Sequence, residues 1–496
     1  MPTITETHRQ IITDFNSIKT AIEDKGVVVG EAHTSDYAAK IADIVGLDFD
    51  NIDYLFKNNS RKVSDIFSAI NWNEIISAIE AFNYTTFEQS TSYTIKVGNW
   101  VTRDMLSHVS TKNSPSDTSL YAVLNVIFTY LNTTGNHDYV MCESSNIKFV
   151  LNNLAREIFD KAFTNSQNII VDVDGLDTSE TQLSLDFNEA FKNVNGFEIL
   201  FTNGTKVEAK RIKNMFNNAR PSYNAVAQNL DLSWLDLSDS NISSQEHMNE
   251  QAFTGIKVEN LTLDMTVKKA GIYKMFNESS SLVSVTGLKV EQDSYSTLTG
   301  GRSNERAFYN CTHLQSIICN TQWVFAGTIK QLFKECYLLA TIPSIKFLHY
   351  SSANYDIEGV FSHCRSLTTI DIEIIYEGSY NNLAARYMFE GCEVLAHITG
   401  ELDLSKITEC RNMFDACYLL EDIETTGSFG GDSSSGSLTL DLSASPVFDI
   451  ADYITRLAAN NSGNTRIIKL NSTVYSNMTQ ATIDLATTKN YTLQSA

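Results

Sequence analysis

The chain has 496 residues, which is long enough for several domains. Its 59 acidic and 37 basic residues give a formal net charge of −22, which argues against nucleic acid and anionic lipid as partners, because both bind through Lys and Arg surfaces. No apolar run of about 18 residues predicts a transmembrane helix.

The N-terminal segment, residues 1–46, predicts two helices. Residues 4–25 place apolar side chains on one helical face and end at Gly26, and residues 35–45 form the second helix. The segment is too small to fold alone, so we expect a docking or oligomerising element; a helical hairpin packed on its own chain is the alternative. The docking candidates on the apolar face are Ile11, Phe15, Ile18 and Ile22.

The next segment, residues 47–160, has mixed patterns. Apolar residues at helical spacing predict helices over 120–131 and 146–163, and alternation over 91–101 predicts a strand. We expect a small mixed α/β domain or an elaborated cap of the repeats that follow.

Residues 161–429 contain a frame of Phe, Cys, Leu and Ile at offsets of three. It is intact at Phe308, Phe333, Phe361, Phe389 and Phe414. At Phe276 the Cys position holds Ser279, and weaker copies begin at Phe163, Phe191, Phe216 and Phe253. Successive Phe residues lie 23 to 37 residues apart, mostly in or near the range of leucine-rich repeats.

Such a frame predicts a solenoid in which Phe packs on Phe, Cys on Cys and Leu on Leu. We expect each repeat to contain a short helix before the Phe, a left-handed turn at residues such as Gly391 or Asn310, and a strand such as 370–374. The predicted core residues are Phe276, Phe308, Cys311, Leu314, Phe333, Cys336, Leu339, Phe361, Cys364, Leu367, Phe389, Cys392, Leu395, Phe414, Cys417 and Leu420.

The eight cysteines carry no zinc-type spacing. Five of them occupy the frame, so we expect buried free thiols that act as small apolar side chains. Neither His313 nor His363, each beside a frame Cys, is then expected to bind metal. Disulfides between repeats are the alternative, and a reducing cytoplasm favours the free thiols.

Two further features follow from spacing. The 37-residue step contains residues 230–238, which we expect to loop out on one face, and that face is often used for binding. Residues 430–496, which begin with a Gly/Ser-rich loop at 430–437, predict a terminal cap. Its expected strands are 438–442, 467–470 and 491–493, and its expected helices are 447–459 and 480–487.

The frame from Met413 to Ile423 resembles the BspA-type leucine-rich repeat of bacterial surface proteins and of phages of gut bacteria, with the best matches between Phe276 and Ile423. Residues 440–443 and 486–493 resemble the ending of such proteins in phages of Bacteroides-like hosts. Residues 18–27 and 36–41 resemble the opening of many phage tail and fibre proteins. The resemblance implies an α/β leucine-rich-repeat solenoid in a phage virion protein.

The sequence contains no phosphate loop, no His-Glu-x-x-His helix and no Gly-x-Ser-x-Gly motif. Acidic residues do recur on strands, and paired carboxylates can cleave glycosidic bonds. Alternation with Ile places them on the solvent side, so we expect no enzyme and no cofactor. The acids concerned are Asp231, Asp264, Asp371 and Glu373.

We therefore expect a non-enzymatic virion protein, tail or fibre associated, made in the host bacterial cytoplasm and present as a homo-oligomer. Its partners would be other virion proteins and a host surface glycan or protein. A bacterial surface or secreted interaction protein and a glycan-degrading tail enzyme are the alternatives. Exposed aromatic residues are the natural ligand anchors: Trp234, Trp323, Tyr350, Tyr355 and Tyr380.

Overall fold

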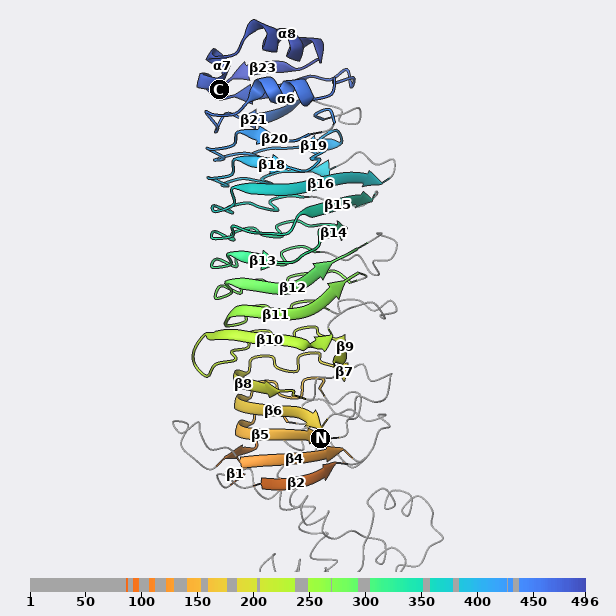
Figure 1. Ribbon diagram of the computed structural model, residues 1–496, viewed down its shortest axis with the longest axis vertical. Coiled ribbons are helices and arrows are strands. Elements are labelled where there is room, and N and C mark those ends of the chain that lie inside the picture. Colours follow the sequence, from red (N-terminus) through yellow and green to blue (C-terminus); the bar gives the residue numbers. More distant parts are fainter. Residues whose placement is uncertain are drawn as a thin grey trace, which may run out of the picture. The chain divides into compact units, whose positions relative to one another are not determined.

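Figure 1 shows a computed structural model of the chain. It describes residues 86–87, 92–97, 107–111, 122–128, 141–152, 159–175, 185–202, 206–236, 249–268, 270–292, 304–350, 357–377, 383–425, 427–430 and 437–496. The predicted N-terminal helices, with Ile11, Phe15, Ile18 and Ile22, lie outside these residues, as do Tyr355 and Tyr380.

The chain divides into two compact units, one of residues 1–181 with 197–203 and one of residues 182–196 with 204–496. In the first unit the strands pair in parallel in the order β1 (Thr86–Phe87), β3 (Ser110–Thr111), β5 (Ser145–Asn152), β4 (Ala122–Phe128) and β2 (Ser92–Val97). β6 (Gln167–Gly175) pairs with β5 and with β8 (Asn195–Leu200). The strand expected over 91–101 is present as β2.

The helices predicted over 120–131 and 146–163 are wrong in the part that the structure describes as strand, because residues 122–128 form β4 and residues 146–152 belong to β5. In β5 the buried residues Ile147, Phe149 and Leu151 alternate with half-buried ones. Both segments are rich in Val, Ile and Phe, which favour a pleated sheet. Their apolar residues fit a period of 3.6 as well as a period of 2, so spacing alone misassigned them.

The second unit is a mostly-strand parallel β-solenoid. One sheet has the order β13 (Ser316–Ile318), β12 (Ser284–Val290), β11 (Val258–Val267), β10 (Ala227–Asp236), β9 (Val207–Arg211) and β7 (Leu185–Asp186). Another has the order β14 (Trp323–Ala326), β15 (Ile345–Tyr350), β16 (Thr369–Glu377), β18 (His397–Thr399) and β20 (Asp422–Ile423). β17 (Leu383–Ala384) pairs with β19 (Ile407–Glu409).

Residues 437–496 contain the helices that the structure describes: α6 (Ile450–Arg456), α7 (Ser472–Ser476) and α8 (Gln480–Thr488). They accompany a parallel sheet of β21 (Leu438–Leu442), β22 (Arg466–Leu470) and β23 (Thr492–Ser495). Side chains of Asp449, Asn471 and Thr479 cap the three helices. The elements predicted here are therefore confirmed to within a few residues.

The segment 230–238 does not loop out as predicted. Residues 227–236 form β10, which pairs with β9 and β11. Alternation of Leu with Asp and Ser in this segment is a strand pattern, and the extra length of this repeat falls in residues 237–248, outside the described part of the chain.

The turn before each frame Cys is not a helix, which corrects the prediction of helix, turn and strand. At Phe389 the second residue on each side, Tyr387 and Gly391, has a left-handed backbone with φ of 57° and 71°. The N–H groups of Tyr387, Phe389 and Gly391 donate to carbonyls of the next repeat at 2.8–3.1 Å. A helix would use these donors within itself, whereas here they join one repeat, or rung, to the next.

The Phe side chains form one continuous stack through the second unit. Neighbouring ring centroids lie 4.6–5.7 Å apart, and the ring planes differ by 4–23°. Every ring is buried. The members are Phe191, Phe216, Phe253, Phe276, Phe308, Phe333, Phe361, Phe389 and Phe414.

The frame cysteines form a second ladder. Each thiol donates to the carbonyl oxygen of the Phe one rung earlier at 3.0–3.2 Å, as Cys364 does to Phe333. Ser279 makes the same bond to Phe253 at 2.7 Å, so a hydroxyl replaces the thiol there. Burial raises the pKa of Cys417 to about 12, which keeps this thiol protonated and able to donate.

All sixteen residues assigned to the core by the frame are at most 1% exposed. All eight cysteines are free thiols; seven are buried, and Cys319 is half-buried.

Replacing Phe333 with Ala should lower the free energy of unfolding by about 3–5 kcal/mol, because it removes a ring from the middle of the stack and leaves a cavity. The measurement is the shift in the urea midpoint of the full chain. Tyr418→Ala is the matched control, since Tyr418 is 52% exposed and should change stability by no more than about 0.5 kcal/mol. Equal shifts for the two variants would contradict the Phe stack.

A thiol reagent should label one cysteine quickly in the native chain and all eight after unfolding in guanidinium chloride. Burial blocks access to the frame thiols and suppresses the reactive thiolate, whereas Cys319 is partly accessible. Mass spectrometry after a short pulse of iodoacetamide counts the labelled sites. The Cys319→Ser variant should lose the fast site; rapid labelling of several frame thiols would refute the buried ladder.

Candidate functional site

The aromatic residues selected as ligand anchors do not gather at one place. Trp323 is fully buried, and its ring stacks between Phe308 and Phe333 while its indole N–H donates to the Leu288 carbonyl at 3.1 Å. It is therefore a core residue, which corrects its assignment as an anchor. Trp234 is half-buried in β10, and Tyr350 ends β15.

The strand acids that could have formed a hydrolytic pair are spread over three strands and have structural partners. Asp231 accepts a hydrogen bond from the backbone N–H of Ser233 at 2.9 Å, and Asp264 forms an ion pair with Lys206. On β16, Glu373 pairs with Lys346 at 3.2 Å.

Asp371 lies on the same strand and is exposed. Partial burial, together with the nearby carboxylates of Glu424 and Glu373, raises its pKa. A raised pKa helps a general acid, but none of these strand acids lines the cavity of the turn face described below.

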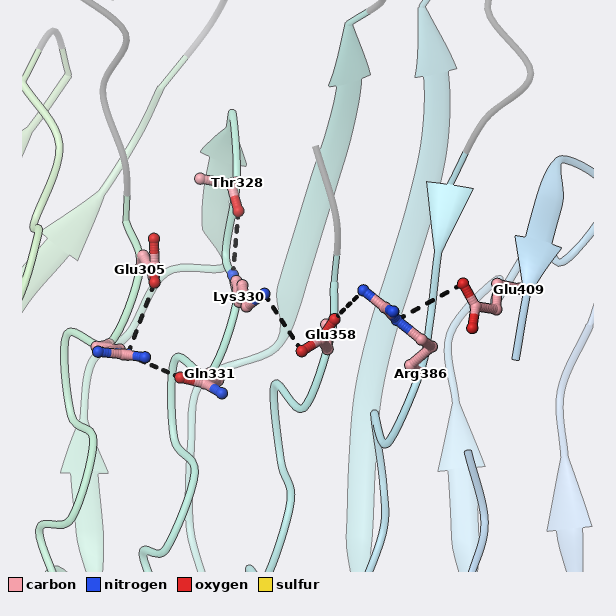
Figure 2. A network of polar contacts seen from close by, with 8 residues as sticks. Glu305, Thr328, Lys330, Gln331, Glu358, Arg386 and Glu409 are labelled. Carbon is pink, nitrogen blue, oxygen red and sulfur yellow. Dashed lines mark hydrogen bonds and ion pairs between the residues drawn. The ribbon is translucent and has the colours of Figure 1, made fainter. Parts of the chain in front are cut away.

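The turns carry a different feature, a row of alternating charges that crosses four rungs and is called here the charged ladder (Figure 2). It consists of Lys330, Glu358, Arg386 and Glu409. Lys330 lies 3.2 Å from Glu358, Arg386 also contacts Glu358, and Arg386 lies 3.7 Å from Glu409. The side chain of Glu358 is only 14% exposed, so its two ion pairs are shielded from solvent more than most surface pairs are.

Beside this ladder the turn face has a shallow cavity of about 190 Å³, called here the Gly359 notch. Gly359 and Ser362 are the two small lining residues and belong to one turn. Longer side chains of the neighbouring rungs also line it. The lining residues are Gln331, Lys334, Glu358, Gly359, Ser362, Tyr387 and Glu390.

The notch exists because one rung departs from its neighbours. The position two residues before the frame Phe has a left-handed backbone in every rung, and elsewhere it holds residues such as Gln331, Tyr387 and Asn412. Gly359 has φ of 61° and leaves that position without a side chain. A Cβ built there would lie 3.6 Å from Gln331 and 3.7 Å from Ser362, so there is space for a side chain that the sequence leaves empty.

Several side chains that line the notch are held in place by contacts with neighbouring residues. The Arg306 guanidinium donates to the Gln331 side-chain oxygen at 2.7 Å, which orients the Gln331 amide. The Ser362 hydroxyl donates to Glu390 at 3.1 Å. On the side of the next rung, the Arg411 guanidinium lies 5.5 Å from the centre of the Tyr387 ring. The notch thus combines fixed donors, fixed acceptors and one aromatic ring.

The Gly359 notch was not among the sites expected from the sequence. The sequence predicts large aromatic residues as ligand anchors, whereas the notch arises from a missing side chain. The signal in the sequence is the residue two before each frame Phe. That residue is Gly359 in one repeat, whereas the other repeats from Phe276 to Phe414 have a side chain there: Lys274, Arg306, Gln331, Tyr387 and Asn412.

Among the residues that the structure describes, no cluster of three or more His, Cys, Asp or Glu side chains could hold a metal ion. Within the same residues, no helix has both the length and the apolar character needed to cross a membrane.

Comparison with known proteins identifies no relative: no family model, no curated protein and no solved structure matches the chain.

Replacing Glu358 with Gln should lower the free energy of unfolding by about 1–2 kcal/mol, because Lys330 and Arg386 would lose a shared charged partner. The effect should shrink at high NaCl, which screens the two remaining cations. Urea midpoints at low and high salt provide the measurement. Glu393→Gln is the matched control: its pair with Arg365, at 3.2 Å, is about half exposed on both sides and should contribute little. A Glu358→Gln effect no larger than that of the control would count against the ladder.

Proposed function

We propose that this chain is a non-enzymatic bacteriophage virion protein, associated with the tail or a fibre, whose repeats display a surface for host attachment or for contacts with other virion proteins. The observation that carries the proposal is the uninterrupted Phe stack of nine rings. A solenoid with such a core holds its surface residues at fixed spacing, and repeated structures use such surfaces for binding.

The assignment to a virion rests on the two ends of the chain. Residues 18–27 resemble the opening of phage tail and fibre proteins, and residues 486–493 resemble the ending of related phage repeat proteins. The N-terminal segment would dock the chain to the particle as a homo-oligomer. We also propose that the repeats are of the BspA leucine-rich type and that residues 430–496, with α6, α7 and α8, act as the terminal cap that a solenoid needs.

The host ligand is proposed to be a surface glycan or protein that contacts the turn face. That face carries the charged ladder and the Gly359 notch, whereas the frame residues are enclosed. The buried frame can thus remain constant from rung to rung while the turn face changes, which is the arrangement expected of a display scaffold.

Mass spectrometry of purified phage particles should detect this chain, and gold-labelled antibody should then place it at the tail tip or the fibres. Label on the head would replace the tail assignment with a capsid decoration. Absence from particles, together with its recovery from a bacterial surface fraction, would overturn the virion proposal in favour of a bacterial interaction protein. Release of oligosaccharide from host capsule by the purified chain would overturn the non-enzymatic assignment.

A further inference from the structure

We infer that the Gly359 notch is a binding site for a single neutral hexose ring of a surface glycan. This inference rests on the proposed function, because it gives the display surface a ligand class and a place.

Size limits the ligand to one ring. The cavity of about 190 Å³ is smaller than the roughly 300–1,000 Å³ of sites that take drug-sized molecules. Its lining comes from three successive rungs, those of Gln331, Gly359 and Tyr387. A terminal or side-branch sugar can enter, whereas a longer chain must remain outside.

The charges lining the notch favour a neutral ligand. Glu358 is already bound by Lys330 and Arg386, and Lys334 faces the same cavity as Glu390. An anionic ligand would meet two carboxylates, and a cationic one would meet Lys334 beside the two cations of the ladder. Either charge would lie beside a like charge of the lining, and that repulsion offsets the attraction to the opposite charge.

The polar groups of the notch match the hydroxyls of a sugar. Carboxylates accept hydrogen bonds from O–H groups, while ammonium and amide N–H groups donate to the hydroxyl oxygens. Glu390 is held by Ser362 at 3.1 Å, and Gln331 is held by Arg306 at 2.7 Å. Among the residues that the structure describes, Lys334 makes one long ion pair, of 3.9 Å with Glu335, which leaves other donors for a ligand.

Tyr387 supplies the apolar surface on which a sugar ring can pack through its C–H groups. The guanidinium of Arg411 covers the ring from the next rung at 5.5 Å from its centre. On the preceding rung the equivalent position is Gly359, which has no side chain to cover the ring. A side chain at residue 359 would occupy the place that we assign to the sugar.

The test measures binding of methyl glucoside, methyl galactoside and methyl mannoside to the full chain by saturation-transfer NMR. We expect at least one of them to bind with a dissociation constant on the order of 1 mM, as is usual for so small a ligand. Gly359→Asn should weaken binding at least tenfold by filling the notch. Asn already occupies the equivalent position at Asn412 with φ of 55°, so this variant should keep the fold.

Tyr387→Asn removes the ring with a residue suited to the same backbone conformation and should also weaken binding at least tenfold. Asn412→Gly is the matched control: it removes a side chain at the equivalent position of another rung and should leave sugar binding unchanged. Equal melting temperatures for the wild type and Gly359→Asn would exclude unfolding as the reason for lost binding.

The inference is overturned if none of the three glycosides receives saturation, or if Gly359→Asn binds as the wild type does. Preferential binding of methyl glucuronide would also overturn it, because the ligand would then be acidic. These outcomes are separate from the virion proposal, which depends on whether particles contain the chain; a virion protein could lack this site, and a bacterial surface protein could have it.

Discussion

The structure of the second unit depends on hydrogen bonds between successive rungs. Donors of one turn bind carbonyls of the next, as Phe389 does to Met413 at 2.9 Å, and the parallel strands continue the same spacing, which is about 4.8 Å. Equivalent residues must then lie above one another at that distance. The Phe stack, with centroids 4.6–5.7 Å apart, and the charged ladder both follow from this single constraint.

The same constraint explains why the frame position holds Cys. The side chain there must be small enough to be buried in the core and must donate to the Phe carbonyl of the rung before. Cys311 and Ser279 both satisfy this requirement, with bonds of 3.0 and 2.7 Å. A buried carbonyl has room for a second hydrogen bond, and satisfying it favours folding. The cysteines are therefore explained by donor chemistry as well as by apolar packing.

Residues repeated at a fixed position were predictable, and residues defined by backbone hydrogen bonding were not. Phe389 and Leu395 could be placed in the core because stacking requires identical neighbours. The turn before Phe389 was mistaken for a helix, since spacing does not reveal whether an N–H group bonds within its own segment or to another rung. Trp323 was misassigned because the size of an aromatic residue does not distinguish a core residue from a ligand anchor.

Because stacking fixes the core positions, the rungs can differ in the residues that they place outside the core. A residue two before the frame Phe needs only to tolerate a left-handed backbone, and Gln331, Gly359 and Tyr387 all meet that need. The side chain at this position can otherwise vary from rung to rung. The Tyr387 ring lies one rung from Gly359, and polar groups are held on either side. The folding of the solenoid does not require this arrangement. The stability of the solenoid does not require the Gly359 notch, which agrees with the proposed role of the notch as a sugar site.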